Sequence, residues 1–335
     1  MTSRLDRLAA DLPGPVLITG GAGFVGSHLT DVLTGAGIPV TVLDDGSNYN
    51  REWVDRRRTG KNIDFREASI LDPAAVSDAM AGCAIVFHFA ANAHIDRGLK
   101  DTGLDFRLSV DGTRNVLEAM REHGVGEIVF PSSGAVYGNL GDGNCSESAG
   151  PLLPLSPYGA GKVAAEALLA SYASLFGIRA WVFRFGNVLG ARMSRGAIHD
   201  FLERLTENPA KLLVLGDGRQ TKSYLIVEDC IEGMLWLRAN AAADTTHPLT
   251  LFNLGNSGGT SVADIADTVL KETGNAGLGI ELSGGRTAFP GDQPVVRLDV
   301  SKAERAGWTP RHPSDEAVRI AVRRLAPEFG LGGGS

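Results

Sequence analysis

Short, almost wholly apolar segments alternate with longer helical segments through the first half of this chain, and this alternation restricts the possible folds more than any other feature. The segments predicted as strands are residues 16–19, 40–43, 63–66, 85–89, 127–131 and 180–185. The segments predicted as helices are residues 24–34, 73–80, 104–122 and 157–176. Strands that are apolar along their whole length are typical of parallel sheets covered by helices on both faces. The sequence therefore predicts an α/β fold with a doubly wound parallel sheet.

The alternation becomes less regular after residue 190. Helices are predicted at residues 197–207 and 261–273, with glycine-containing loops between them. Residues 223–227, followed by a helix from Glu228, have the pattern of a strand that returns to the main sheet. We predict a large first domain over residues 14–186, completed by strands and helices from about 222–260. A smaller lobe is predicted from residues 187–221 and 261–330, with a flexible tail at 331–335.

Charge and cysteine content exclude several classes of protein. Lys and Arg number 32 and Asp and Glu number 39, and the resulting charge of −7 gives no support to a nucleic-acid-binding surface. The cysteines, Cys83, Cys145 and Cys230, are too few and too scattered for a disulfide framework, and the histidines lack metal-ligand spacing, so no metal is proposed. Residues 1–11 predict a short helix, and no apolar run approaches the roughly 20 residues needed to span a bilayer. We expect a cytoplasmic protein without a membrane segment.

A glycine-rich turn follows the first predicted strand and opens the first helix. Gly20, Gly23 and Gly26 are spaced so that the backbone can turn tightly and approach a pyrophosphate at the positive end of the helix. Asp44 ends the next strand, where its carboxylate can accept hydrogen bonds from both hydroxyls of an adenosine ribose. Because no arginine follows Asp44 immediately, a 2′-phosphate would be repelled. The pattern predicts NAD as the cofactor in preference to NADP.

Tyr158 and Lys162 lie one helical turn apart at the start of a long predicted helix, so they share one face. A phenol has a pKa near ~10, and a neighbouring ammonium together with a positive nicotinamide ring lowers that pKa towards neutrality. The same pair is also compatible with two surface residues on an exposed helix. Ser133, however, directly follows a buried strand, at the sheet edge where ligands bind in doubly wound folds. That position favours a catalytic interpretation of the pair.

These motifs together resemble the extended short-chain dehydrogenases/reductases of the NAD-dependent nucleotide-sugar epimerase/dehydratase family, close to members of the UDP-glucose 4-epimerase type. The resemblance covers about residues 16–322. It rests on the turn from Thr19 to Gly26, the LDD strand end, His88-Phe89-Ala90-Ala91, the SSxxVYG pattern, the YxxxK pair and Arg184-Phe185-Gly186-Asn187-Val188. It implies a Rossmann fold whose first domain binds NAD and whose smaller lobe binds a nucleotide sugar.

The resemblance also implies roles for individual residues. Ser133 matches the residue that hydrogen-bonds the C4 oxygen of the sugar, Tyr158 matches the base, and Lys162 matches the lysine that holds the nicotinamide ribose and lowers the pKa of the tyrosine. The residues expected to bind the cofactor are Gly20, Gly23, Phe24, Val25, Gly26, Asp44, Ser69, Ile70, Ala90, Ala91, Tyr158 and Lys162. The residues expected to bind the substrate are Ser133, Asn187 and Lys222, together with Arg286 or Arg192 in place of an arginine that relatives carry before Gly291-Asp292 and this chain lacks.

The residues beside Ser133 distinguish the reactions of this family. Dehydratases carry an acidic pair and uronate decarboxylases a glutamate in this stretch, whereas this chain has Gly134 and Ala135, which transfer no proton. We expect a 4-epimerase of UDP-hexoses, such as UDP-glucose, UDP-galactose or a derivative, that acts by transient oxidation at C4 and return of the hydride. The alternative is a 5,6- or 4,6-type dehydratase or an oxidoreductase of a sugar or antibiotic pathway, in which Cys145 or Glu147 would take part. The intact catalytic residues argue against a non-catalytic NAD-binding sensor.

The two long helices predicted at residues 104–122 and 157–176 have more apolar positions than one sheet contact requires. Relatives pack the corresponding helices against a second copy, so the resemblance implies a homodimer built through a four-helix bundle. The expected partners are therefore a nucleotide sugar and a second copy of this chain.

Overall fold

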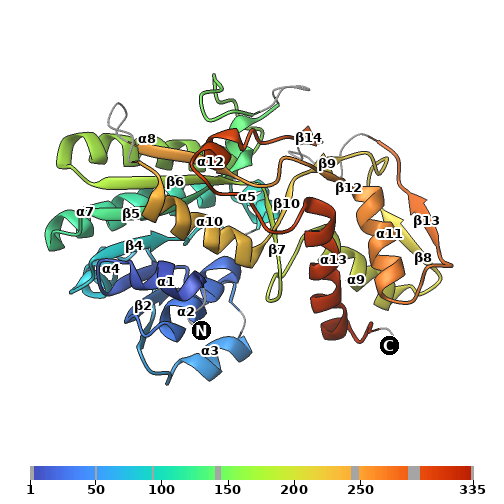
Figure 1. Cartoon of the computed structure of the whole chain (residues 1–335), viewed down its shortest axis with the longest axis horizontal. Coiled ribbons are helices and arrows are strands. Elements are labelled where there is room, and N and C mark those ends of the chain that lie inside the picture. Colours follow the sequence, from blue (N-terminus) through green and yellow to red (C-terminus); the bar gives the residue numbers. More distant parts are fainter. Residues whose placement is uncertain are drawn as a thin grey trace.

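A seven-stranded parallel sheet forms the centre of the molecule, with the strand order β11-β6-β5-β4-β1-β2-β3 (Figure 1). The computed structural model describes residues 4–49, 51–92, 94–139, 145–242, 249–285 and 295–332. The strands of this sheet are β1 (Val16–Thr19), β2 (Val40–Asp44), β3 (Ile63–Glu67), β4 (Ile85–His88), β5 (Glu127–Ser133), β6 (Arg179–Phe185) and β11 (Leu249–Leu254). The parallel sheet confirms the predicted doubly wound, Rossmann-type fold.

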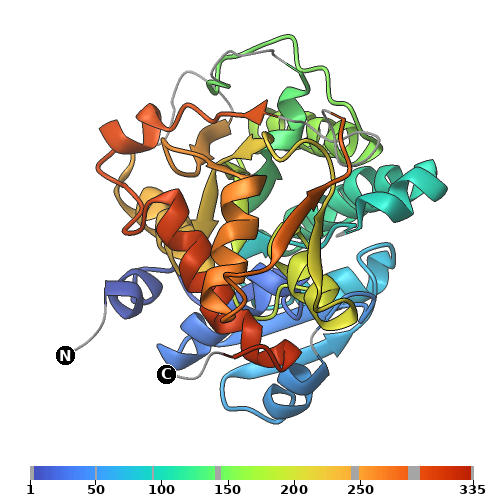
Figure 2. The same ribbon diagram turned by 90° about the vertical axis from the view of Figure 1, so that its right-hand side faces the viewer.

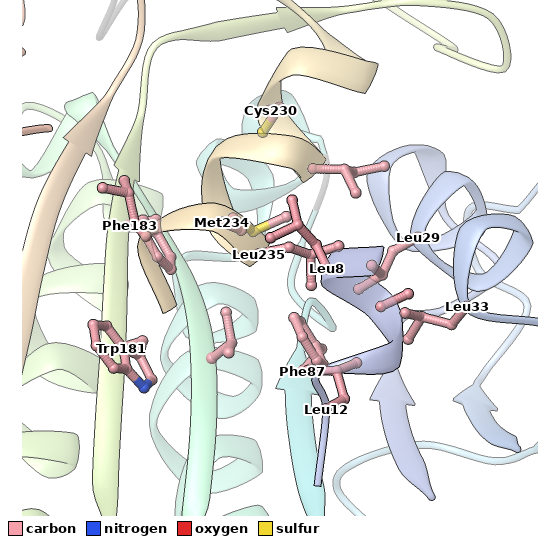
Figure 3. Close-up of a cluster of buried hydrophobic side chains, with 14 of the residues drawn as sticks. Leu8, Leu12, Leu29, Leu33, Phe87, Trp181, Phe183, Cys230, Met234 and Leu235 are labelled. Carbon is pink, nitrogen blue, oxygen red and sulfur yellow. The ribbon is translucent and has the colours of Figure 1, made fainter. Parts of the chain in front are cut away.

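Helices cover both faces of this sheet. One face carries α1 (Arg4–Ala10), α2 (Phe24–Gly35) and α10 (Val227–Asn240). Figure 3 labels Leu8, Leu29 and Met234 from these three helices, which form one buried cluster with Phe87 of β4. The other face carries α4 (Pro73–Met80), α7 (Thr113–His123) and α8 (Pro157–Phe176). These helices bury a second cluster on the sheet, so the apolar strands lie between two cores.

The segment predicted as one helix at residues 104–122 is divided in the structure. It consists of α6 (Thr102–Phe106), the π-helical segment η1 (Arg107–Gly112) and α7. Gly112 lies so close to Ile70 that a Cβ there would overlap the isoleucine side chain. A π-helical turn changes which residues face the sheet, and hydrophobic spacing does not show where such a turn occurs.

The C-terminal half builds a second lobe with a core of its own. Its main elements are β7 (Asn187–Leu189), α9 (Ala197–Glu207), β8 (Lys211–Val214), β10 (Tyr224–Ile226), α11 (Val262–Glu272), β13 (Gly279–Leu282) and α13 (Ser314–Leu325). Figure 2 shows α11 (orange) beside α13 (red), and their buried faces contribute Ile265 and Val318 to this core. The division of the chain into two domains at the predicted bounds stays a prediction.

One strand prediction in this half is wrong. Residues 223–227 do not return to the main sheet, because β10 pairs with β7 in a separate two-stranded sheet. The strand that completes the main sheet is β11, which pairs with β6. Both β7 and β10 are only three residues long, and a segment that short shows its apolar character but not its pairing partner.

The remaining elements are short. They are α3 (Arg51–Arg57), α5 (Ile95–Lys100), η2 (Gly134–Tyr137), β9 (Thr221–Lys222), β12 (Thr260–Ser261), β14 (Val295–Val296), α12 (Ser301–Arg305) and η3 (Ala326–Phe329). Among the described residues, none of the helices combines the length and the apolar character that crossing a bilayer requires.

Candidate active site

The glycine-rich turn leaves β1 along a path that excludes side chains. Gly20 has a φ of 68°, and a Cβ there would lie 2.6 Å from the backbone nitrogen of Ala90. A Cβ on Gly26 would overlap the carbonyl oxygen of Gly20. The turn therefore opens directly onto the amino end of α2, which begins at Phe24. This bare backbone beside a helix amino terminus fits the pyrophosphate of a dinucleotide.

Asp44 lies beside this turn, at the carboxyl end of β2. Its Oδ2 accepts a hydrogen bond from the backbone nitrogen of Ala22 and its Oδ1 accepts one from that of Gly46, each at 3.0 Å. Burial raises the pKa of the Asp44 carboxyl, and these amide donors oppose the rise. The carboxylate is thus held in one orientation at the rim where a ribose would follow the pyrophosphate.

The histidines near the sheet edge have protein partners. His88 is buried between Thr19 Oγ1, at 2.6 Å from Nδ1, and Thr113 Oγ1, at 3.1 Å from Nε2. Burial lowers the pKa of His88 to about 3, so its imidazole is neutral and joins β1 to α7. His94 Nε2 lies 3.1 Å from Asn48 Oδ1. Within the described ranges, no group of three or more His, Cys, Asp or Glu side chains is arranged to hold a metal ion.

Ser133 and Tyr158 meet at the carboxyl edge of the sheet. Ser133 is the last residue of β5, and its Oγ accepts a hydrogen bond of 3.1 Å from the backbone nitrogen of Ala135. Tyr158 lies in the first turn of α8, which is capped by Ser156. The Ser133 side chain is close enough to Tyr158 to act on the pKa of its phenol. Burial raises the pKa of Tyr158, while the Ser133 side chain and the charge of Arg195 act to lower it.

Lys162 lies one turn farther along α8 and is buried beneath the site. Its Nζ donates a hydrogen bond of 2.8 Å to the carbonyl oxygen of Pro131, and it lies 4.5 Å from the ring centroid of Phe130. The centre of the Tyr158 ring is 6.0 Å away. Burial lowers the pKa of Lys162 to about 8. In this arrangement the ammonium is bound to the backbone of β5, and its direct effect on the phenol stays a prediction.

A cleft of about 880 Å³ brings most of the predicted site residues together. It runs from the glycine-rich turn, along the carboxyl edge of the sheet, to residues of the second lobe. The predicted residues that line it are Gly20, Gly23, Phe24, Val25, Gly26, Asp44, Ile70, Ala90, Ala91, Ser133, Tyr158, Lys162, Asn187 and Lys222. Residues that are far apart in the chain therefore share one site, and its two ends are built by different lobes.

Three predicted residues are not placed in this cleft. Arg192 donates a 2.8 Å hydrogen bond to Asp31 of α2 and lies outside the lining. Ser69 Oγ accepts a hydrogen bond of 3.2 Å from the backbone nitrogen of Leu71 and also lies outside it. Arg286 belongs to residues 286–294, which lie outside the described part of the chain. Arg192 and Ser69 therefore have partners within the protein, and their predicted contacts with substrate and cofactor stay predictions.

The cleft also contains charged residues that the sequence reasoning missed. Arg195, Asp200 and Arg204 line the end formed by the second lobe. Arg204 donates a 2.8 Å hydrogen bond to the carbonyl oxygen of Leu213. Asp200 and Arg204 are one turn apart on α9, a spacing that could have identified their shared face. No comparable signal distinguishes Arg195 from Arg192 in the sequence.

Cys145 and Glu147, which the alternative dehydratase reaction would use, have protein partners away from the cleft. The backbone nitrogen of Cys145 donates to the carbonyl oxygen of Arg297 at 2.8 Å, and burial raises the pKa of its thiol. Glu147 Oε1 accepts a 2.8 Å hydrogen bond from the backbone nitrogen of Asn253. Both residues are described, and neither lines the cleft.

Known proteins resemble this chain along most of its length. The model of the "NAD dependent epimerase/dehydratase family" matches residues 16–255. A putative UDP-glucose 4-epimerase of Methanocaldococcus jannaschii is 32% identical over 312 residues, which are 92% of this chain and 97% of that protein. A crystal structure of a UDP-galactose 4-epimerase has a TM-score of 0.82 and 35% identity, and the match covers 94% of this chain and 99% of the other. A dTDP-glucose 4,6-dehydratase double mutant from Streptomyces venezuelae, solved with NAD bound, has a TM-score of 0.83 and 26% identity over 94% and 98% of the two chains.

Proposed function

Because the chain belongs to the NAD-dependent epimerase/dehydratase family, we propose that it is a 4-epimerase of nucleotide sugars. Its cofactor is NAD, as in the family. The proposed substrates are UDP-hexoses, such as UDP-glucose, UDP-galactose or a derivative, and the proposed compartment is the cytoplasm. The observation that carries this proposal is that Ser133 and Tyr158 line one cleft, with no further acid or base from Gly134 and Ala135 beside them.

The residues of the first domain fit NAD. The bare backbone from Gly20 to Gly26 would bind the pyrophosphate at the amino end of α2, and Asp44 would bind the adenosine ribose. Ala90 and Ala91 leave room at the ends of β1 and β4. Lys162, buried under Tyr158, would bind the nicotinamide ribose. When bound, NAD supplies the reversible removal of hydrogen from the C4 carbon.

Tyr158 is the proposed acid and base of the reaction. It would accept the proton of the C4 hydroxyl during oxidation and donate it back during reduction. Ser133 would hold the C4 oxygen beside the phenol throughout, because its hydroxyl is fixed by the backbone of η2. Lys222 and Asn187 lie at the second-lobe end of the cleft, where they would bind the nucleotide diphosphate. Inversion then requires the keto sugar to turn about this anchor, and the small side chains at Gly134 and Ala135 leave space for that turn.

Dehydration is the competing reaction, and the family contains both. Elimination of water from the sugar requires an acid and a base in addition to the tyrosine. Glu147 is bonded to the backbone of β11 and Cys145 is packed against the segment around Leu298, so neither can reach a sugar without rearrangement. These contacts support epimerisation over dehydration.

The proposed assembly is a homodimer formed through α6, α7 and α8. Three large apolar side chains of α6 and α8 are exposed, namely Phe106 at 58%, Leu175 at 73% and Phe176 at 44%. Burial of such side chains against a second copy would stabilise the dimer. A monomeric mass at micromolar concentration in sedimentation equilibrium would contradict this assembly.

The function is tested with a panel of UDP- and dTDP-linked hexoses, with products identified by NMR. Inversion at C4 with no change in mass is the expected result. A product lighter by one water would identify a dehydratase instead. Oxidised product with equal release of NADH would identify a simple oxidoreductase.

A further inference from the structure

Glu166 holds the carboxyl end of β5 from inside the protein. Its Oε1 accepts a hydrogen bond of 2.5 Å from Ser132 Oγ. The same carboxylate accepts two hydrogen bonds from Arg184 of β6, from Nε at 3.0 Å and from one Nη at 2.6 Å. The side chains of Glu166 and Arg184 are only 7% and 5% exposed. One buried ion pair therefore links α8 to two adjacent strands of the sheet.

This carboxylate lies next to two parts of the catalytic site. Ser132 immediately precedes Ser133, so the hydrogen bond from Ser132 restrains the strand end that presents the Ser133 hydroxyl to Tyr158. Glu166 is also one helical turn after Lys162, on the same face of α8. The mechanism described above uses neither Glu166 nor Arg184.

The groups around Lys162 define its electrostatic environment. The carboxylates of Glu166 on α8 and Asp105 on α6 favour its charged form, whereas burial opposes that form. On the sheet side it meets the Pro131 carbonyl and the Phe130 ring. His88 is close enough to be affected by the ammonium but is itself neutral. Glu166 is thus one of two negative groups that keep a buried ammonium charged.

We propose that Glu166 is a positioning residue for the proposed epimerase reaction, which orients Ser133 through Ser132 and places a negative charge beside Lys162. Two effects follow from one side chain. The hydrogen bond through Ser132 determines where the C4 oxygen of the substrate is held. The negative charge determines the pH range over which Lys162 is an ammonium and can act on the ribose and on Tyr158.

The principal test is Glu166→Gln, which preserves the shape of the side chain and removes its charge. Without this charge the Lys162 ammonium is less stable, so its pKa falls below about 8. The alkaline limb of the kcat profile is expected to move down by about one pH unit. A loss of activity that is equal at every pH would show a merely structural role and would overturn the proposal.

Glu127 provides a matched control at the other end of β5. It is also buried, with Oε2 3.1 Å from Arg238 and Oε1 2.8 Å from Trp181 Nε1. Glu127→Gln removes a similar buried charge, at the end of β5 opposite to Ser132 and Ser133. It is expected to lower the melting temperature without moving the alkaline midpoint. If it moves that midpoint as much as Glu166→Gln does, the proposal is wrong.

Two milder variants separate the effects and remain informative if Glu166→Gln fails to fold. Ser132→Ala breaks the hydrogen bond but preserves every charge, so it should lower kcat severalfold at an unchanged midpoint. Asp105→Asn removes the other carboxylate near Lys162 and should move the midpoint down as Glu166→Gln does. An unchanged kcat in Ser132→Ala, or an unchanged midpoint in Asp105→Asn, would each count against the proposal.

The inference rests on the proposed function, so we add a measurement on Lys162 that does not require turnover of a substrate. The titration of the Lys162 ammonium is followed by NMR in lysine-labelled protein and assigned with Lys162→Arg. A lower midpoint in Glu166→Gln than in the wild type supports the electrostatic half even if no nucleotide sugar is epimerised. Identical midpoints would overturn it whatever reaction the enzyme performs.

Discussion

Tyr158, in the first turn of α8, and Ser133, at the end of β5, line the same cleft, so the proposed base and the residue that would hold the C4 oxygen act on one site. Burial raises the pKa of Tyr158 and the Ser133 side chain lowers it. The phenol of Tyr158 can both accept and donate a proton near neutral pH only if its neighbours offset the rise in pKa that burial causes.

Tyr158→Phe preserves the ring and removes the transferable proton. We expect activity to fall by roughly 10²- to 10⁴-fold while NAD binding is retained. Ser133→Ala should cost less, because it removes a hydrogen bond and raises the pKa of Tyr158 but leaves the phenol in place. Steady-state kinetics and NAD titration measure both. Equal activity of Tyr158→Phe and wild type would remove Tyr158 from the reaction.

Arg195 and Arg192 are near neighbours in sequence with different predicted effects. The positive charge of Arg195 lowers the pKa of Tyr158, so Arg195→Ala should raise that pKa and move the acidic limb of the pH profile up by about one unit. Arg192 is paired with Asp31 outside the cleft, so Arg192→Ala should reduce thermal stability and leave the pH profile in place. A shift of the pH profile in Arg192→Ala but not in Arg195→Ala would favour Arg192 as the site residue.

Asp44→Ala tests the choice of cofactor. The carboxylate is fixed by the amides of Ala22 and Gly46, and we expect it to repel a 2′-phosphate. Its removal should weaken NAD binding and reduce the preference for NAD over NADP. Calorimetry gives the dissociation constants of NAD and NADP and so measures this effect. An unchanged ratio would show that Asp44 does not contact the ribose.

A substrate deuterated at C4 tests the direct return of hydrogen to the carbon that lost it. The proposed cycle predicts inverted product that retains the deuterium, since the proton exchanged through Tyr158 belongs to the oxygen. Mass spectrometry and NMR of the product locate the label. Solvent hydrogen at C4 would exclude this cycle.

Much of the first domain could be predicted from local sequence patterns. Strands such as β1 are apolar along their whole length because helices cover both faces of the sheet, so short apolar runs between helical segments identify them. The glycine-rich turn can also be identified from the sequence, because a side chain at Gly20 or Gly26 would overlap the backbone. The one-turn spacing of Tyr158 and Lys162 places both on one helix face in any α-helix.

Other features depend on contacts between segments that are distant in the chain. Apolar character does not choose a pairing partner, so the tertiary structure alone shows that β11, and not β10, completes the main sheet. Arg192 and Arg195 look alike in the sequence, but Asp31 of α2 binds Arg192, while Arg195 lines the cleft. The contact of Glu166 with Ser132 joins α8 to β5, which lies earlier in the chain. Local sequence determines which segments form helices, strands and tight turns. The partners of buried charges are determined by how the helices pack on the completed sheet.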